Sequence, residues 1–188
     1  MQVYFLENNE WFKPLSNLLY KAKNGRILPD NDERYSYFSI ASLATLPHLF
    51  WKPDVIICND WQNATTPMIY NQIYKSREFY EDIKTVLIVH NIDEHCTYDR
   101  SIYDKLGVKL PNKIVGNKIN CYEAAIEDVD LLISLDSTSK NNTKKLLQLP
   151  LVKANKKKLV SMDIDDEENP NFDSTASKIN DELTKHFA

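Results

Sequence analysis

The fold is indicated by the segment Lys52-Pro-Asp-Val-Ile-Ile-Cys-Asn-Asp-Trp-Gln62, in which a short apolar run ends abruptly in polar and aromatic residues. Residues Val55–Ile57 are consecutive β-branched side chains, a pattern typical of a parallel strand that is buried on both faces. In open α/β sheets, ligands bind at the carboxyl ends of the strands. The sequence therefore predicts a binding site that begins at Asn59 and Asp60, directly after a buried strand.

A second segment repeats this arrangement. Residues Lys84–Val89 are apolar and rich in β-branched side chains, and His90 and Asn91 follow them. Because the two strands would end at the same edge of a parallel sheet, we expect Asp60 and His90 to face one crevice. These side chains would suit a polar small molecule or a sugar, because they include an acid, an imidazole, carboxamides and an indole. The indole of Trp61 would stack on the C–H face of glucose. The candidate site residues are Asn59, Asp60, Trp61, Gln62, His90 and Asn91.

Strands and helices alternate along the chain, which predicts an α/β fold with a three-layer, Rossmann-like parallel sheet wound by right-handed crossovers. Further strands are expected at residues 2–6, 130–135 and 159–162. Helices are expected from residue 30, from 61 to 74, around 115–126, at 138–147 and at 174–187, with an irregular polar stretch at 91–110. We expect one domain over residues 1–188, in which residues 150–188 form a divergent strand, acidic loop and helix.

Two of these helices carry apolar residues at helical spacing, which predicts the face that each turns to the core. The first stripe consists of Tyr37, Ile40, Ala41, Ala44 and His48, and the last consists of Ala176, Ile179, Leu183 and Phe187.

Composition excludes several classes of protein. The chain has 188 residues, of which 43% are apolar and 27% charged, as in a soluble single domain. No run approaches the ~18 apolar residues of a membrane helix, and a net charge of −4 argues against nucleic-acid binding. Three widely spaced cysteines indicate a reducing cytoplasm. With only three glycines, isolated from one another, the chain has no G-x-G-x-x-G loop to bind a diphosphate.

Other interpretations of the same residues compete with a binding site. Asp60 could simply cap the following helix, and the pair after the second strand could satisfy loop backbone. A metal hydrolase would use His90, Asp93, His95 and Cys96, but the two histidines lack the helical i, i+4 spacing of H-E-x-x-H, so we expect no metal. The acidic run 163–168 lacks the glycine and the final glutamate of an EF-hand, which favours a solvated loop.

Four segments together resemble the N-terminal catalytic domain of bacterial glycogen synthases and plant starch synthases. They occur in the same order and rough spacing as in that family, and they are Val3-Tyr-Phe-Leu-Glu-Asn8, Asp30-Asn-Asp-Glu-Arg34, Lys52-Pro-Asp54 through Gln62, and Thr85 through His90-Asn91. The resemblance spans roughly Met1 to Ser139. It implies half of a GT-B glycosyltransferase that moves glucose from ADP-glucose to an α-1,4-glucan, retains configuration and needs no metal or cofactor.

The resemblance also implies roles for the candidate residues. Asp60 matches the family's acidic residue on the acceptor side, and His90 matches the histidine that contacts the transferred glucose. Trp61, Gln62 and Asn91 match neighbours of these groups. Neither Asp60 nor His90 is expected to act as a nucleophile.

The chain also departs from the family pattern. It contains no counterpart of the family's first βα unit, which carries the K-x-G-G-L loop, and none of the family's second Rossmann domain. We therefore expect little turnover by this chain alone. It would be either an incomplete portion or a reduced relative of a synthase. The alternative function is a non-catalytic glucan-binding or regulatory module. Expected partners are an α-glucan acceptor, a donor-binding domain and, through exposed apolar edges, a second copy of the chain.

Overall fold

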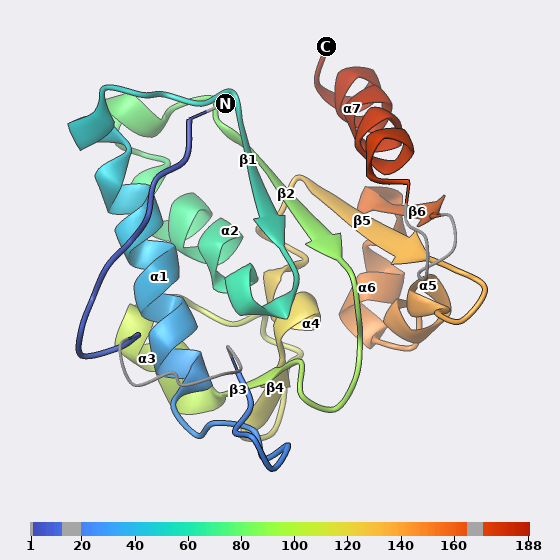
Figure 1. Cartoon of the computed structure of the whole chain (residues 1–188), viewed down its shortest axis with the longest axis horizontal. Coiled ribbons are helices and arrows are strands. Elements are labelled where there is room, and N and C mark those ends of the chain that lie inside the picture. Colours follow the sequence, from blue (N-terminus) through green and yellow to red (C-terminus); the bar gives the residue numbers. More distant parts are fainter. Residues whose placement is uncertain (1, 13–19, 165–170) are drawn as a thin grey trace.

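The computed structural model describes residues 2–12, 20–164 and 171–188. Its main sheet has four parallel strands, in the order β1 (Val55–Asn59), β2 (Lys84–Val89), β5 (Leu131–Asp136) and β6 (Leu159–Asp163) (Figure 1). A separate antiparallel pair is formed by β3 (Thr97–Asp99) and β4 (Lys118–Asn120). The α/β fold class with a parallel sheet is confirmed, as are the four strands predicted within the main sheet.

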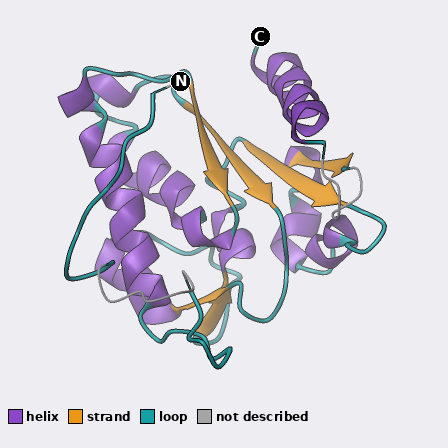
Figure 2. Ribbon diagram, in the orientation of Figure 1, coloured by secondary structure: helices purple, strands orange, loops and turns teal. Residues whose placement is uncertain are grey.

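Helices pack around the main sheet in the described part of the chain (Figure 2). They are α1 (Asn31–Thr45), α2 (Thr65–Ile69), α3 (Arg100–Leu106), α4 (Cys121–Ala125), α5 (Asn142–Leu146), α6 (Pro150–Ala154) and α7 (Phe172–Phe187). A 3₁₀ turn at Trp61–Asn63 precedes α2, and a π-helical turn at Tyr70–Tyr74 continues it, so the helix predicted at 61–74 is confirmed in outline. None of the described helices is long and apolar enough to cross a membrane.

The sheet separates two layers of helices. Successive residues of a strand point to opposite faces, so Leu87 and Val89 of β2 join the core beneath α1, α2 and α4, whereas Val86 and Ile88 face the other side. There, α7 packs its side chains Ile179, Leu183 and Phe187 onto the sheet. The prediction of a three-layer arrangement and of this α7 face is therefore confirmed, except that Ala176 is exposed.

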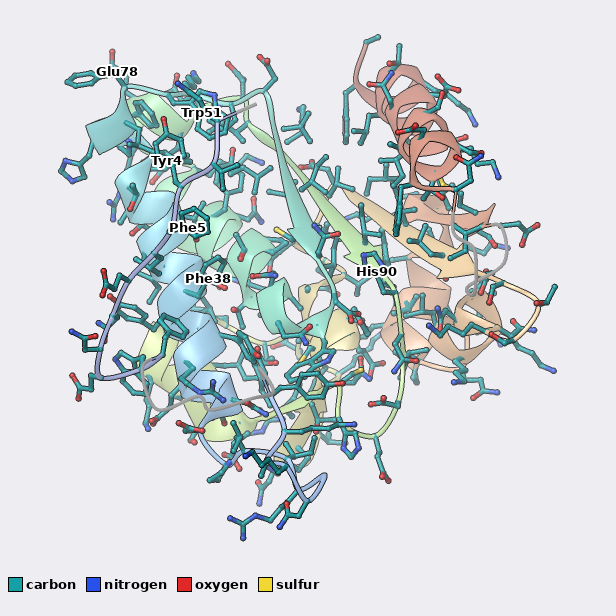
Figure 3. The ribbon with its side chains drawn as sticks, viewed as in Figure 1. Tyr4, Phe5, Phe38, Trp51, Glu78 and His90 are labelled. Carbon is teal, nitrogen blue, oxygen red and sulfur yellow. The ribbon has the colours of Figure 1, made fainter. Side chains whose placement is uncertain are left out.

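The strand predicted at residues 2–6 does not form. This segment runs alongside α1 without pairing to a described strand (Figure 1). The ring of Tyr4 lies 6.5 Å from that of Trp51, and both residues are labelled in Figure 3. Tyr4, Phe5 and Leu6 line a hollow together with residues of α1, and Phe5 is 92% exposed. An apolar and aromatic sequence is thus insufficient for a strand when no neighbouring strand pairs with it.

Three other predictions fail in the middle of the chain. The stretch 91–110, predicted to be irregular, contains β3 and α3, and the latter is capped by the Asp99 side chain. The helix predicted around 115–126 is replaced by β4 followed by the short helix α4, and Val115 is 84% exposed. The helix predicted at 138–147 begins only at Asn142, and α6 was not predicted.

The core-facing stripe predicted for α1 is also wrong. The helix buries Asn31, Arg34, Ser36, Ser39 and Leu43, whereas Ile40 and His48 of the predicted stripe are exposed. Ser39 is tolerated inside because it finds a partner: the hydroxyl oxygens of Ser39 and Thr65 lie 3.0 Å apart. A helix whose buried face is polar cannot be oriented by apolar periodicity.

We expect the chain to self-associate through the edge of β1 that faces away from β2. No described strand pairs with this edge, and the strand carries no lysine or proline to protect it. Ile57 is 43% exposed. We expect the Ile57→Lys variant to sediment with a lower weight-average mass than the wild type at the same concentration. The control is Val115→Lys, which charges an equally apolar but loop-borne position; a wild type that stays monomeric at all concentrations would contradict the prediction.

Candidate functional site

The candidate site lies at the carboxyl ends of β1 and β2, which are neighbours in the sheet. The side chains of Asn59 and His90 meet there, because Nε2 of His90 lies 3.0 Å from Oδ1 of Asn59. Figure 3 labels His90 directly after β2. A carboxamide oxygen only accepts hydrogen bonds, so this contact favours the tautomer of neutral His90 in which Nε2 carries the proton and Nδ1 is an acceptor. Both residues are exposed to solvent, so a ligand can reach them.

Asp60 occupies an unusual backbone conformation, with φ 61° and ψ −178°. Its amide donates to the carbonyl of Ile88 over 2.8 Å, which ties the turn after β1 to β2. A residue other than glycine in this region costs about 1–3 kcal/mol, and such strain is concentrated at functional sites. The turn thereby directs the Asp60 carboxylate toward the interior of the site instead of the following helix. The Asp60 side chain makes no capping hydrogen bond to that helix.

The carboxylate of Asp60 contacts the hydroxyl of Tyr122, the second residue of α4. The same hydroxyl lies 2.7 Å from the carbonyl oxygen of Asn91. Burial, reinforced by the charge of Asp60, raises the pKa of Tyr122 well above its ordinary value, so the phenol stays protonated. Tyr122 thus joins the loops that follow β1 and β2, whereas the sequence placed it only within the helix expected around 115–126.

The pKa of His90 is lowered from its ordinary value. Partial desolvation against the strand ends is the largest cause, and the positive charge of Lys140 acts in the same direction. The carboxylate of Asp60 opposes both effects by favouring the imidazolium. His90 is therefore mainly neutral at pH 7 and can exchange hydrogen bonds with a sugar hydroxyl.

Trp61 does not occupy the position predicted for it. The side chain is only 4% exposed, and its ring makes edge contacts with Tyr20, Tyr35 and Tyr98 at centroid distances of 5.8, 5.7 and 5.8 Å. Its sequence position beside Asp60 suggested a sugar platform, but the 3₁₀ turn rotates the indole into the core. Trp61 supports the site from behind and offers no free face to a ligand.

Asn142 at the start of α5 also supports the site and was not predicted. Its carboxamide nitrogen donates to the carbonyls of His90 (3.1 Å) and Leu135 (2.7 Å), which links the ends of β2 and β5. The side chain is fully buried. Its position in the sequence, six residues after a strand, is typical of many helix starts and carries no signal for this role.

The metal-hydrolase interpretation finds no support in the geometry. Among the described residues, no three His, Cys, Asp or Glu side chains come together as a metal site. Asp93 instead organises its own loop, because it accepts from the Asn91 side chain (2.6 Å) and from the His95 amide (2.8 Å). Cys96 is buried, and burial raises its pKa to about 12, which disfavours the thiolate that binds metals.

A hollow of about 590 Å³, separate from the candidate site, lies at the ends of β5 and β6. Its central carboxylate, Asp136, already accepts from the Thr143 amide (3.0 Å) and from the Ser161 hydroxyl (2.8 Å). Burial alone would raise the pKa of Asp136, but these hydrogen bonds lower the pKa below its ordinary value. Asp136 is a structural residue. Of the acidic run next to this hollow, residues 165–168 lie outside the described residues, so the predicted loop stays a prediction.

Comparisons with known proteins agree with the motifs. Residues 1–147 match the family model described as "Starch synthase catalytic domain". The chain is 36% identical over 138 residues to a glycogen synthase of Chlorobium phaeobacteroides, covering 70% of the chain and 27% of that protein. It is 32% identical over 153 residues to a glycogen synthase of Chlorobium luteolum, covering 78% and 30%. The chain thus spans less than a third of these relatives.

A solved structure resembles the fold. It is the catalytic domain of starch synthase IV from Arabidopsis thaliana bound to ADP and acarbose, with a TM-score of 0.60 and 23% identity. The match covers 72% of this chain and 30% of that one. This likeness supports a parallel α/β half of the GT-B type. By the extent of its family match and its identity to the bacterial relatives, the chain belongs to the starch synthase catalytic-domain family of glycosyltransferases.

Proposed function

We propose that this chain forms the acceptor side of a glycogen synthase that transfers glucose from ADP-glucose to an α-1,4-glucan, with His90 and Asp60 at the reaction centre. The observation that carries the proposal is the convergence of these two residues at adjacent strand ends, one held by Asn59 and the other by Tyr122. The bacterial relatives named glycogen synthase support this assignment.

The two residues have different roles in the proposal. Neutral His90 would accept a hydrogen bond at Nδ1 from a glucosyl hydroxyl, and its ring would lie beside the positive charge that develops on the transferred sugar. Asp60 would accept hydrogen bonds from acceptor hydroxyls and fix the glucan terminus for attack. Asn59 and Asn91 hold these groups in place. Neither His90 nor Asp60 forms a covalent intermediate, and the transfer uses no metal or cofactor.

The donor is expected to bind mainly outside this chain. The diphosphate of ADP-glucose needs several cationic or amide donors, whereas Lys140 is the cation that acts on His90 in the described part of the site. We therefore propose that the chain by itself binds glucan without completing transfer, and that a donor-binding domain completes the enzyme. We place this enzyme in the cytoplasm, in keeping with three free and buried cysteines.

Calorimetric titration with maltohexaose and, separately, with ADP-glucose tests the proposal. We expect wild-type chain to bind maltohexaose, and His90→Ala and Asp60→Asn each to weaken that binding about tenfold, which corresponds to ~1.4 kcal/mol. Asparagine is used at position 60 because it has nearly the same shape as aspartate and removes only the negative charge. Maltohexaose binding that both substitutions leave unchanged would refute the proposed centre. Tight binding of ADP-glucose would show that the donor site lies within the chain.

A further inference from the structure

The hollow of about 590 Å³ at the carboxyl ends of β5 and β6 is distinct from the proposed reaction centre, because none of the candidate site residues lines it. Its walls come from the two strand ends, from the turn after β5 and from α5, which lies beside the strand ends (Figure 1). Backbone hydrogen bonds close this turn, from the Ser137 amide to the Lys140 carbonyl (2.9 Å) and from the Lys140 amide to the Ser137 carbonyl (3.3 Å). Ligands of open α/β sheets bind at such strand ends.

The hollow has cationic groups on one side and oxygen acceptors on the other. Lys140 in the turn and Lys144 in α5 supply two ammonium groups. Ser161 and Asp163, at the end of β6, supply a hydroxyl and a carboxylate. The carboxylate of Asp136 also lines the hollow, but its oxygens already accept hydrogen bonds within the fold. The exposed side chains of Lys144 and Asp163 therefore present opposite charges to a ligand.

These groups favour a ligand with an anionic group at one end and hydroxyl groups at the other. Ammonium groups donate to phosphate oxygens, and a carboxylate accepts from sugar hydroxyls. Inorganic phosphate would face the negative charge of Asp163, and a neutral sugar would leave both ammonium groups unused. The volume lies within the range of about 300–1,000 Å³ that is typical of small-molecule sites. We propose that the hollow binds a sugar phosphate, whose phosphate contacts the two lysines and whose hydroxyl groups contact the end of β6.

The segment that lines the hollow also contacts the reaction centre. Asn142 follows the lining residue Asn141, and its carboxamide donates to the His90 carbonyl over 3.1 Å. Two charges act on the His90 imidazole: the carboxylate of Asp60 raises its pKa, and the ammonium of Lys140 lowers it. A phosphate bound to Lys140 would offset the second charge, so His90 should respond to the ligand. That this response regulates glucosyl transfer rests on the proposed function.

Calorimetric titration at pH 7 with glucose 6-phosphate, inorganic phosphate and glucose tests the site. Glucose 6-phosphate should bind at least about tenfold more tightly than either smaller ligand, because it alone engages both sides of the hollow. Lys144→Met should weaken the binding of glucose 6-phosphate and of inorganic phosphate about tenfold. Asp163→Asn should weaken glucose 6-phosphate and strengthen inorganic phosphate, because it removes a charged acceptor for hydroxyl groups that also repels the phosphate.

Matched controls remove the same side-chain types from exposed positions elsewhere. Lys153→Met on α6 and Asp181→Asn on α7 should bind all three ligands as the wild type does. No binding of glucose 6-phosphate by the wild type, or equal binding by the Lys144→Met protein, would overturn the site. Tighter binding of inorganic phosphate than of glucose 6-phosphate, with no effect of Asp163→Asn, would overturn the sugar-phosphate assignment. Loss of glucose 6-phosphate binding in His90→Ala would place the ligand at the reaction centre and contradict the proposal.

Nuclear magnetic resonance of the His90 ring, recorded without glucan, tests the link to the reaction centre. Saturating glucose 6-phosphate should raise the pKa of His90 more than sodium chloride does at equal ionic strength, because chloride only screens the Lys140 charge. Lys144→Met should remove the difference. Equal pKa values of His90 with the two solutes would refute the link. Because neither measurement uses glucan, a failure of the proposed glucan site would leave both results unchanged.

Discussion

Replacing Trp61 by alanine is expected to destabilise the chain by about 3–5 kcal/mol, the range for removal of a large buried aromatic side chain. The indole fills a space among Tyr20, Tyr35 and Tyr98, whose rings it meets edge to face. Edge contacts of this kind add about 0.5–1.5 kcal/mol beyond burial. Urea unfolding monitored by circular dichroism measures the loss as a lower transition midpoint.

Two further variants separate a core role from a sugar platform. Trp51→Ala removes the same side chain from a site that is 52% exposed, and it should change stability by less than about 1 kcal/mol. Trp61→Phe keeps an aromatic ring in the core and should retain maltohexaose affinity. If Trp61→Phe abolished glucan binding without lowering stability, Trp61 would contact the ligand and the present placement would be incorrect.

The Tyr122→Phe variant is expected to lose about tenfold in maltohexaose affinity, in addition to about 1–3 kcal/mol of stability. Its hydroxyl contacts both the Asp60 carboxylate and the Asn91 carbonyl, so phenylalanine leaves these acceptors without their shared donor. Asp60 would then no longer be held against the loop that follows β2. Calorimetric titration and urea unfolding of the same preparation measure both effects.

Tyr70→Phe is the matched control for this variant. The Tyr70 hydroxyl is also buried between two carbonyls, those of Tyr80 (2.9 Å) and Ile83 (2.8 Å), but it lies outside the candidate site. Its removal should cost similar stability and leave glucan affinity unchanged. Equal affinities for the Tyr70→Phe and Tyr122→Phe proteins would mean that Tyr122 supports the fold alone and does not position Asp60.

The sequence predicted the four strands of the main sheet because each is a short apolar run. The expected burial of β1 on both faces was wrong, because β1 is an edge strand in which only Cys58 is buried. The sequence also predicted that the carboxyl ends of β1 and β2 would be adjacent, which places Asp60 and His90 at one edge of the sheet.

The sequence failed for α1, where Arg34 and Ser39 are buried. Arg34 contacts Asn31 and Asp30 at the start of its own helix, and the Ser39 hydroxyl lies 3.0 Å from that of Thr65, so apolar periodicity carries no signal for this buried face.

The contacts that complete the candidate site could not be predicted for a related reason. The hydroxyl of Tyr122 meets a carboxylate 62 positions earlier in the chain, and the Asn142 carboxamide reaches a carbonyl 52 positions away. Local patterns identify the element that carries each residue but not its distant partner. The burial of Trp61 depends in the same way on three tyrosines from separate segments.

Calorimetric titration of maltohexaose into wild-type chain, His90→Ala and His48→Ala tests the central claim most directly. His48 is an exposed histidine near the end of α1, away from the strand ends. The account predicts that His90→Ala weakens binding about tenfold while His48→Ala binds as wild type. Equal affinities in all three proteins, or no binding by the wild type, would contradict a glucan site at the ends of β1 and β2.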